Sequence, residues 1–224
     1  CLIVPLAFTL PSDPRVRDEN VVHTGSIGAI REAFAHRGFV LLTAGFFVCG
    51  FHVAFITVHL PIYVADLKLA PMVGAYAISL IGIFNIFGSL LSGAFGQRFS
   101  KKLGLSGIYA LRALVLTIFL LSPKTTEVIY LFAATMGILW LSTVPLTAGL
   151  VAQVFGIRYM ATLYGFVFLS HQIGSFIGVW MGGYIHDVTG SYDLMWQAGI
   201  VLGLVAAIIH LPINEAPVAR LQRA

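Results

Sequence analysis

Six long apolar stretches constrain the fold of this chain more than any other feature of its sequence. Each has about the 17 to 25 residues that a helix needs to cross roughly 30 Å of hydrocarbon. Lipid offers the backbone no hydrogen-bond partners, so such segments must be helices; strands of a membrane barrel would be about half as long and would alternate in polarity. We therefore predict an all-α membrane protein with a six-transmembrane-helix bundle, its spans lying approximately at 39–60, 72–95, 103–122, 127–150, 163–185 and 194–212.

The composition supports a membrane location and excludes several other classes of protein. Hydrophobic residues make up 58% of the 224 and charged residues only 10%, whereas a soluble domain carries about 25% charged residues. Lipid must therefore cover much of the surface. Cys1 and Cys49 provide neither a disulfide framework nor a metal-ligand pair, and no run of Lys and Arg is dense enough for nucleic acid. We expect no metal, no cofactor and no nucleic-acid partner.

The two ends of the chain differ from the bundle. Residues 1–10 are apolar but about half as long as a spanning helix, so we interpret them as the tail of a truncated preceding span, and the chain as a fragment. Residues 11–37 are predicted to form a cytoplasmic linker, in which 26–34 make a short amphipathic helix along the membrane surface. The bundle occupies 38–212, and 213–224 form a cytoplasmic tail.

Lysine and arginine lie mainly on one side of the predicted membrane. With residues 11–37 in the cytoplasm, ten of the 13 basic residues fall in inner segments, Lys68 and Lys124 fall in outer ones, and Arg112 lies within a span. An excess of Lys and Arg marks the cytoplasmic loops of membrane proteins. The sequence thus predicts that both ends of the bundle are cytoplasmic, in a multi-pass protein that we assign to the bacterial inner (plasma) membrane.

A ladder of small residues in the fifth span predicts close packing against another helix. Its members recur every four residues, a spacing that lets a second backbone approach; they are Ser170, Gly174, Gly178 and Gly182. In the second span, Ser89 and Gly93 have the same spacing. We expect a close helix contact at both places.

The six spans divide into two sets of three, at 39–122 and 127–212. The first span of each set carries a proline that follows hydroxyl residues, at 57–61 and at 142–145. Proline removes a backbone donor and bends a helix. Interruptions at corresponding places in two repeats point to the binding site of a transporter, so we predict an interrupted helix at each.

The loop after the second span carries a pattern of glycine and basic residues, Gly93, Arg98, Lys101 and Lys102. This pattern resembles the cytoplasmic signature of the major facilitator superfamily, which consists of a glycine, an Asp-Arg pair and a basic pair. The family's aspartate falls at Gln97 here. The resemblance implies that this loop takes part in the conformational change of the protein.

Three further stretches extend the resemblance over the whole chain. Residues 49–66 are similar to the seventh span of a bacterial branch of the superfamily, 155–165 to the inner loop before the eleventh span, and 182–192 to the outer end of that span. The resemblance implies the C-terminal half of a twelve-helix fold, made of two inverted three-helix repeats. The nearest branch is that of the monocarboxylate and oxalate/formate porters. An acid and an arginine of its eighth span would fall at Asn85 and Ser89, so both charges are absent here.

Arg112 is the most costly side chain in the predicted spans. It lies about 15 Å of helical rise beyond Lys102, and all nine acidic residues lie in loops or at span ends. An unpaired arginine near mid-membrane costs at least roughly 2.5 to 3.5 kcal/mol, so Arg112 must face protein or water. Two interpretations remain open. Arg112 is either a counter-charge for an anionic substrate or a structural residue satisfied by carbonyls and polar groups of neighbouring helices.

Polar residues inside the spans are the other candidates for a site. His52 lies in the middle of the first span, and His171 and Gln172 lie one-third into the fifth; the resemblance implies that these two helices line a central cavity. Imidazole there could bind a carboxylate or move a proton, or it could remain neutral and bridge two helices. Asn85 and Trp140 could add a polar contact and an aromatic wall.

Together these features predict secondary active transport of a small organic solute, an organic anion, by alternating access, as symport or antiport. The resemblance implies an N-terminal six-helix half as partner, surrounding lipid, and protons as a candidate coupling ion. The sequence carries no GxxxxGK[ST] motif for ATP. The alternatives are a non-transporting membrane receptor or scaffold, which would lack a solvent cavity, and an intramembrane enzyme. An enzyme would need a clustered set such as HExxH or a Gly-x-Ser-x-Gly elbow, which is absent, so we expect none.

Overall fold

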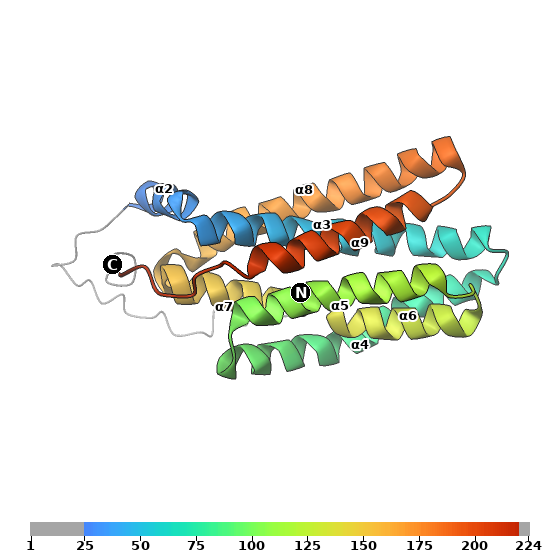
Figure 1. Ribbon diagram of the computed structural model, residues 1–224, viewed down its shortest axis with the longest axis horizontal. Coiled ribbons are helices and arrows are strands. Elements are labelled where there is room, and N and C mark those ends of the chain that lie inside the picture. Colours follow the sequence, from blue (N-terminus) through green and yellow to red (C-terminus); the bar gives the residue numbers. More distant parts are fainter. Residues whose placement is uncertain (1–24, 220–224) are drawn as a thin grey trace, which may run out of the picture.

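The computed structural model describes residues 25–219, and within that range every regular element is an α-helix (Figure 1). The all-α prediction is therefore confirmed. Predictions for residues 1–24 and 220–224, including the truncated span at 1–10, lie outside the described residues. The helices are α2 (Ser26–Ala35), α3 (Arg37–Asp66), α4 (Pro71–Arg98), α5 (Lys101–Leu121), α6 (Thr126–Leu139), α7 (Thr143–Phe155), α8 (Ile157–Thr189) and α9 (Asp193–His210).

Six helical segments are long and apolar enough to cross a membrane, as predicted. Five of them are the single helices α3, α4, α5, α8 and α9, and the sixth, Thr126–Phe155, consists of α6 followed by α7. The spans are joined by connections of at most four residues. Successive spans therefore run antiparallel along the long axis of the molecule (Figure 1).

The helix pairs with the most extensive contacts reveal two related halves. They are α3 with α8, α4 with α6, and α5 with α9. Consider an exchange of α3 with α6–α7, of α4 with α8 and of α5 with α9. The α3–α8 pair then becomes the α6–α4 pair, and the α5–α9 pair remains the same pair. Because each set holds three spans and therefore runs in the opposite direction to the other, this exchange describes two inverted three-helix repeats.

The α3–α8 contact confirms the ladder of small residues. A Cβ atom on Gly178 would lie 2.6 Å from the carbonyl oxygen of Phe51, and one on Gly174 would collide with the carbonyl of Phe47. The Ser170 hydroxyl donates to the carbonyl of Thr43 at 2.7 Å. Gly50 of α3 has the reciprocal role, since a Cβ there would collide with the His171 carbonyl of α8. The two backbones thus approach more closely than larger side chains would permit.

The contact expected at Ser89 and Gly93 of α4 is made by another residue. Gly88 faces the Ile138 carbonyl of α6 so closely that no Cβ would fit. The Ser89 hydroxyl instead donates to Asn85 Oδ1 at 3.3 Å, and a Cβ on Gly93 would meet Pro145 at an ordinary 3.9 Å. The prediction was one position from the true contact, because spacing alone does not fix which face of a helix meets its neighbour.

The prediction of two corresponding interruptions was wrong for the first span. α3 continues through Pro61 to Asp66 without a break. Close packing against α4 accompanies this proline, since a Cβ on Gly74 would lie 3.0 Å from the Pro61 Cα atom. A proline near the end of a long helix removes one hydrogen bond without stopping the helix when neighbours hold it in place.

The second interruption is present. α6 ends at Leu139 and α7 begins at Thr143, so the fourth span is broken in its middle. Pro145 is the third residue of α7, where the backbone nitrogen has no intrahelical acceptor and proline is tolerated. Only one of the two repeats therefore has a broken first helix, and the candidate site lies at that break.

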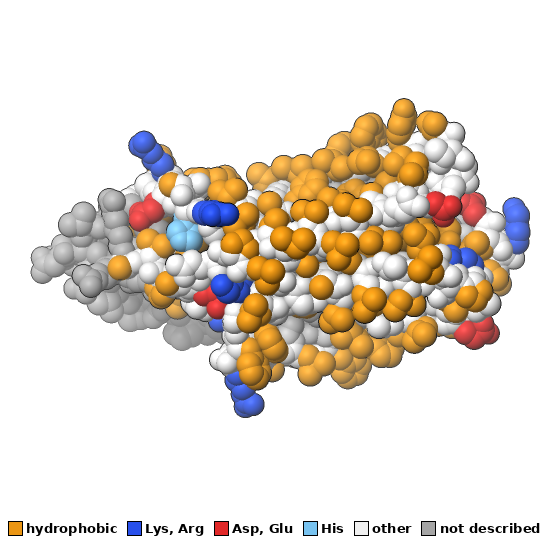
Figure 2. Space-filling view, in the orientation of Figure 1, with side chains coloured by type: hydrophobic (Ala, Val, Ile, Leu, Met, Phe, Trp, Pro, Cys, Tyr) orange, Lys and Arg blue, Asp and Glu red, His pale blue; other side chains and the backbone are white. Residues whose placement is uncertain are grey.

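The two ends of the bundle carry the charges, and the apolar side chains lie between them (Figure 2). Short helix α2 forms at the end that holds the Lys and Arg residues Arg31, Arg37, Arg98, Lys101, Lys102 and Arg158. Its Ala29 and Ala33 pack into the core, whereas Ile27 is 84% exposed. Such a helix can present Ile27 to the membrane surface while its small residues hold it against the bundle.

Candidate functional site

The break between α6 and α7 places free backbone groups in the interior of the bundle. The last carbonyls of a helix and the first amides of the next have no intrahelical partners. In lipid these groups must find partners within the protein, because each unsatisfied group costs several kcal/mol. Three of the residues predicted for the site supply or receive such contacts here.

Arg112 of α5 is buried beneath the break, with 1% of its surface exposed. Its Nε and Nη2 atoms donate to the Leu139 carbonyl at 3.2 and 2.7 Å, and Nη2 also donates to the Trp140 carbonyl. The guanidinium thus occupies the C-terminal end of α6, where the helix dipole is negative. Its carbon lies 5.4 Å from the centre of the Tyr109 ring. These are contacts expected of the structural interpretation.

One guanidinium nitrogen remains available. Nη1 of Arg112 is buried and has no hydrogen-bond partner among the described residues. No carboxylate reaches Arg112 either, since the ion pair found among residues 25–219 joins Asp66 to His186 at the far end of the bundle. Among the described residues, carbonyl dipoles and the Tyr109 ring therefore face the positive charge, and it leaves a positive potential in the core of the protein.

Asn85 of α4 reaches the break from the opposite side. Its Oδ1 atom accepts a hydrogen bond from the Leu141 amide at 3.0 Å and another from Ser89 at 3.3 Å. Asn85 thus satisfies an amide that the helix interruption leaves free. Trp140 is buried, and it contributes its backbone carbonyl to Arg112. The structure brings Asn85, Arg112 and Trp140 together around three consecutive residues.

His171 joins this group through Thr143 and through Cys49, of which sequence reasoning did not select Cys49. Thr143, the first residue of α7, shares a 3.2 Å hydrogen bond with the Cys49 thiol of α3. His171 of α8 lies near the same thiol. His171 Nδ1 also lies 3.1 Å from Gln172 Oε1, and Gln172 is exposed on the surface of the bundle. A continuous set of polar groups therefore runs from the break to the outside of α8.

His52 lies near Arg112 but points in another direction. Its Nε2 atom donates to the Gly199 carbonyl of α9 at 2.8 Å, and only 2% of the residue's surface is exposed. The remaining nitrogen, Nδ1, has no partner among the described residues. This contact joins two helices, as in the bridging interpretation of the histidine.

Helix periodicity carried a signal for the residues that were missed. Cys49 and His52 are three residues apart on α3, and Tyr109 and Arg112 are three apart on α5, so each pair shares a helix face. The Tyr109 hydroxyl donates to the Gly45 carbonyl at 2.7 Å and fixes α5 against α3. The other polar contacts of a helix are thus expected on the same face as its buried charge.

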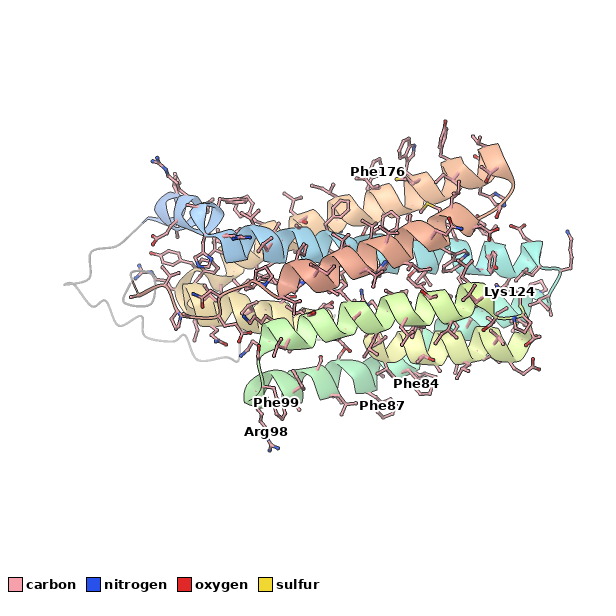
Figure 3. The ribbon with its side chains drawn as sticks, in the orientation of Figure 1. Phe84, Phe87, Arg98, Phe99, Lys124 and Phe176 are labelled. Atoms are coloured by element: carbon pink, nitrogen blue, oxygen red, sulfur yellow. The ribbon has the colours of Figure 1, made fainter. Side chains whose placement is uncertain are left out.

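The predicted loop motif lies at the basic end of the bundle. Arg98 is the last residue of α4 and is exposed, and Figure 3 shows it pointing away from the helices. Lys101 Nζ donates to Gln153 Oε1 of α7 at 2.7 Å. The backbone amide of Lys102 donates to Glu215 Oε1 at 2.7 Å. The motif therefore ties the start of α5 to the end of α7 and to the segment after α9.

Gly93, the first residue of that motif, makes no close contact. A Cβ placed on it would meet Pro145 at 3.9 Å, an ordinary van der Waals distance. Its neighbour Gly96 is the crowded position, since a Cβ there would lie 2.7 Å from the Leu146 side chain. Gly96 therefore brings the end of α4 against α7.

The opposite end of the bundle is held by a second polar group. His59 of α3 is buried there. Its Nε2 donates to the Val179 carbonyl at 3.0 Å, so its Nδ1 accepts from the Tyr192 hydroxyl at 3.1 Å. Burial, and the negative charges of Asp66 and Asp187, raise the pKa of Tyr192 above its usual value. The neutral phenol is thereby kept as a donor to His59.

Comparisons with known proteins agree with this arrangement. The family model described as Major Facilitator Superfamily matches residues 1–179 and, in a second overlapping alignment, residues 42–223. A protein of Bacillus subtilis (strain 168) named "Uncharacterized MFS-type transporter YcxA" is 29% identical over 176 residues, which cover 76% of this chain and 43% of that protein. The Mus musculus protein named "Monocarboxylate transporter 14" is 27% identical over 202 residues, which cover 84% of this chain and 38% of that protein. The chain spans less than half the length of these curated relatives.

Proposed function

Since this chain belongs to the Major Facilitator Superfamily, we propose that it forms one six-helix half of a secondary transporter that moves a small organic anion across the membrane. Membership supports the assignment of the chain to a multi-pass membrane transporter. We propose in addition that the solute is an organic anion, that a second six-helix half completes the transporter, and that transport proceeds by alternating access.

The buried charge of Arg112 is the observation that carries the choice of an anion. It lies in the middle of a span, whereas the acidic residues of the described range lie outside the spans or near their ends. A cation in a low-dielectric interior attracts an anionic solute much more strongly than it would in water. The mouse relative is named as a monocarboxylate transporter, which is consistent with a carboxylate as the anionic group.

The α6–α7 break is the proposed place where the solute binds. Broken helices near the bilayer midplane form the substrate sites of many secondary transporters. In the proposed complex, Arg112 Nη1 donates to the carboxylate, and Asn85 and Gln172 supply directional contacts beside the Trp140 wall. Solute binding would also compete with the carbonyls of Leu139 and Trp140 for the guanidinium. Release of those carbonyls would link occupancy to the geometry of the break.

The proposed coupling ion is a proton carried by histidine. His171 is adjacent to exposed Gln172 and lies near the Cys49 thiol that leads to the break, so it can exchange protons at the exposed face of α8. His52 is more deeply buried and bonded to a backbone carbonyl, which makes it the second candidate. Symport and antiport are both compatible with this placement.

The proposed partner is an N-terminal six-helix half that covers the exposed apolar faces of α4 and α8. Phe87 and Leu90 of α4, and Phe176 of α8, have more than half of their surface exposed. Figure 3 shows Phe87 and Phe176 projecting away from the bundle on different sides. In alternating access, this half would rock against its partner around a site at the midplane.

Uptake by the whole protein, reconstituted in vesicles, tests the proposal. A panel of radiolabelled monocarboxylates, zwitterionic amino acids and organic cations should show accumulation of the anionic monocarboxylates only. Arg112→Lys, which keeps the charge, should retain this preference, while Arg112→Gln should abolish uptake at equal amounts of folded protein. Lys124→Gln removes a positive charge at the far end of the bundle and serves as the control. Uptake of cations, or undiminished carboxylate uptake by Arg112→Gln, would refute the anion proposal.

A further inference from the structure

An apolar groove lies between α4 and α5 and borders the α6–α7 break of the candidate solute site. Its volume is about 330 Å³, and its floor is formed by the end of α6 and the start of α7. Figure 1 shows α4 and α5, the neighbouring helices that supply its two walls. The side chains of Leu91 and Phe95 line one wall, and Leu111 lines the other. Gly107 widens the groove, since a Cβ there would meet nothing within 4 Å.

The groove has no polar group available for a hydrophilic ligand. Its two hydroxyl residues, Ser92 and Ser142, donate to carbonyls of their own helical segments, those of Ser89 and Ile138. A water molecule needs two to four polar partners to remain in a cavity. The occupant of this groove must therefore be an apolar chain, which also excludes the anionic solute proposed for the break.

The position of the groove matches one leaflet of a bilayer. It begins beside the 99–100 connection between α4 and α5 and extends to Leu111 of α5. From Gly104 to Leu111 the helical rise is about 10 Å, which is less than the roughly 15 Å of hydrocarbon in one leaflet. Leu91 and Leu111 are at least half exposed at its edges, so the groove opens sideways toward lipid.

Basic residues surround the end of the groove that lies at the membrane boundary. Arg98 is exposed there beside Phe99, as Figure 3 shows. The Lys101 side chain lies along α7, with its Cε atom 3.1 Å from a Cβ placed on Gly149 and its ammonium group bonded to Gln153. Lys102 follows directly, and Glu215 is the acidic side chain that contacts this end, through the Lys102 amide. Three positive charges against one negative charge favour an anionic headgroup.

We propose that the groove binds one acyl chain of an anionic phospholipid, whose headgroup lies against Arg98 and Lys102. The acyl chain fills a space that neither water nor the solute can occupy. Lipid tails and the groove are equally apolar, so the hydrophobic effect does not select this lipid over bulk lipid. The charge of the headgroup selects the lipid, because each Lys or Arg near the surface raises the occupancy by an anionic lipid about fivefold.

Photo-crosslinking with lipids tests the proposal independently of transport. The whole protein that carries this chain is placed in phosphatidylcholine vesicles containing a small fraction of phosphatidylglycerol with a photoreactive acyl chain. Labelled peptides are then mapped by mass spectrometry. Labelling should concentrate on the groove residues relative to Ile118 and Leu121, which are exposed at the far end of α5. A photoreactive phosphatidylcholine should label the groove several-fold less, and Arg98→Gln should reduce phosphatidylglycerol labelling about fivefold.

A filled groove provides the matched control. Gly107→Leu places a side chain inside the groove and should remove its labelling. Gly165→Leu makes the same change on α8, where a Cβ also meets nothing within 4 Å, and should leave labelling unchanged. Both changes replace glycine in a helix and favour folding. Equal labelling by the two lipids, or an unlabelled groove beside labelled Ile118 and Leu121, would overturn the proposal; the second result would mean that a protein segment covers the groove.

Discussion

At the scale of single residues, Arg112 shows how a buried charge is accommodated without an acidic partner. Its contacts are backbone carbonyls at the end of α6. The sequence predicts the depth of Arg112 and the need for a partner, because both follow from its distance along the helix. It does not predict which carbonyls are free, since this depends on where α6 stops in three dimensions.

Replacement of Arg112 by lysine should loosen the break while leaving the charge in place. An ammonium group lacks the planar fork that donates to two adjacent carbonyls, so we expect a loss of about 1 to 2 kcal/mol of stability. Hydrogen exchange of the amides at 139–143 should become faster. Arg158→Lys changes an exposed arginine and is the control. Unchanged protection of these amides in Arg112→Lys would show that Arg112 does not hold the break.

His59 gives a second prediction at this scale. Replacement by alanine removes the hydrogen bonds of the His59 ring to the Val179 carbonyl and the Tyr192 hydroxyl. Each lost bond should lower the free energy of unfolding by about 1 kcal/mol. His186→Ala removes the more exposed ion pair to Asp66, which should cost less than about 1 kcal/mol. Thermal unfolding in detergent compares the two variants. Equal losses of thermal stability in the two variants would show that burial does not strengthen the contacts of His59.

At the scale of helices, the small-residue ladder was predictable in α8 but misplaced in α4. In α8, four small residues in one row leave a single possible contact face. In α4, Gly88, Ser89 and Gly93 lie on overlapping faces, and packing against α6 selects Gly88. Pro61 illustrates the same limit, because the local tendency of proline to interrupt α3 is overridden by the helices around it.

A leucine at Gly178 should separate α3 from α8. The new side chain would meet the backbone of Phe51, which cannot rotate away, so the cost should be about 3 kcal/mol, at the upper end for overpacked sites. Reaction of buried Cys49 with a thiol dye during heating would report the loss of packing. Gly165→Leu on the same helix faces open space and should unfold no lower than the unmodified protein, because leucine favours the helix more than glycine does. Unfolding of the two variants at one temperature would refute the close contact.

At the scale of the whole molecule, the distribution of charge predicts the orientation in the membrane. Six spans and their short connections follow from hydrophobic length alone, and the structure agrees with them. The convergence of α4, α5 and α6 on one break could not be foreseen, because it depends on contacts between residues far apart in the chain. The sidedness of the bundle stays a prediction from its basic end.

Cysteine labelling of cells measures that sidedness. In a variant without native cysteines, Lys124→Cys should react with a membrane-impermeant maleimide added outside intact cells, because Lys124 lies in the predicted outer loop. Arg98→Cys should react only after the membrane is opened, because Arg98 lies in the predicted cytoplasmic loop. Figure 3 shows these two residues at opposite ends of the molecule. The reverse pattern of labelling would invert the predicted topology.

The interlocked backbones of α3 and α8 have a consequence for motion inside this half. Gly50, Gly174 and Gly178 each face a carbonyl of the partner helix, so neither helix can slide along the other without a steric collision. These two helices should move together as one rigid body. Flexing driven by a bound molecule would then be confined to the joint at 140–142, where the fourth span has no continuous hydrogen-bonded backbone.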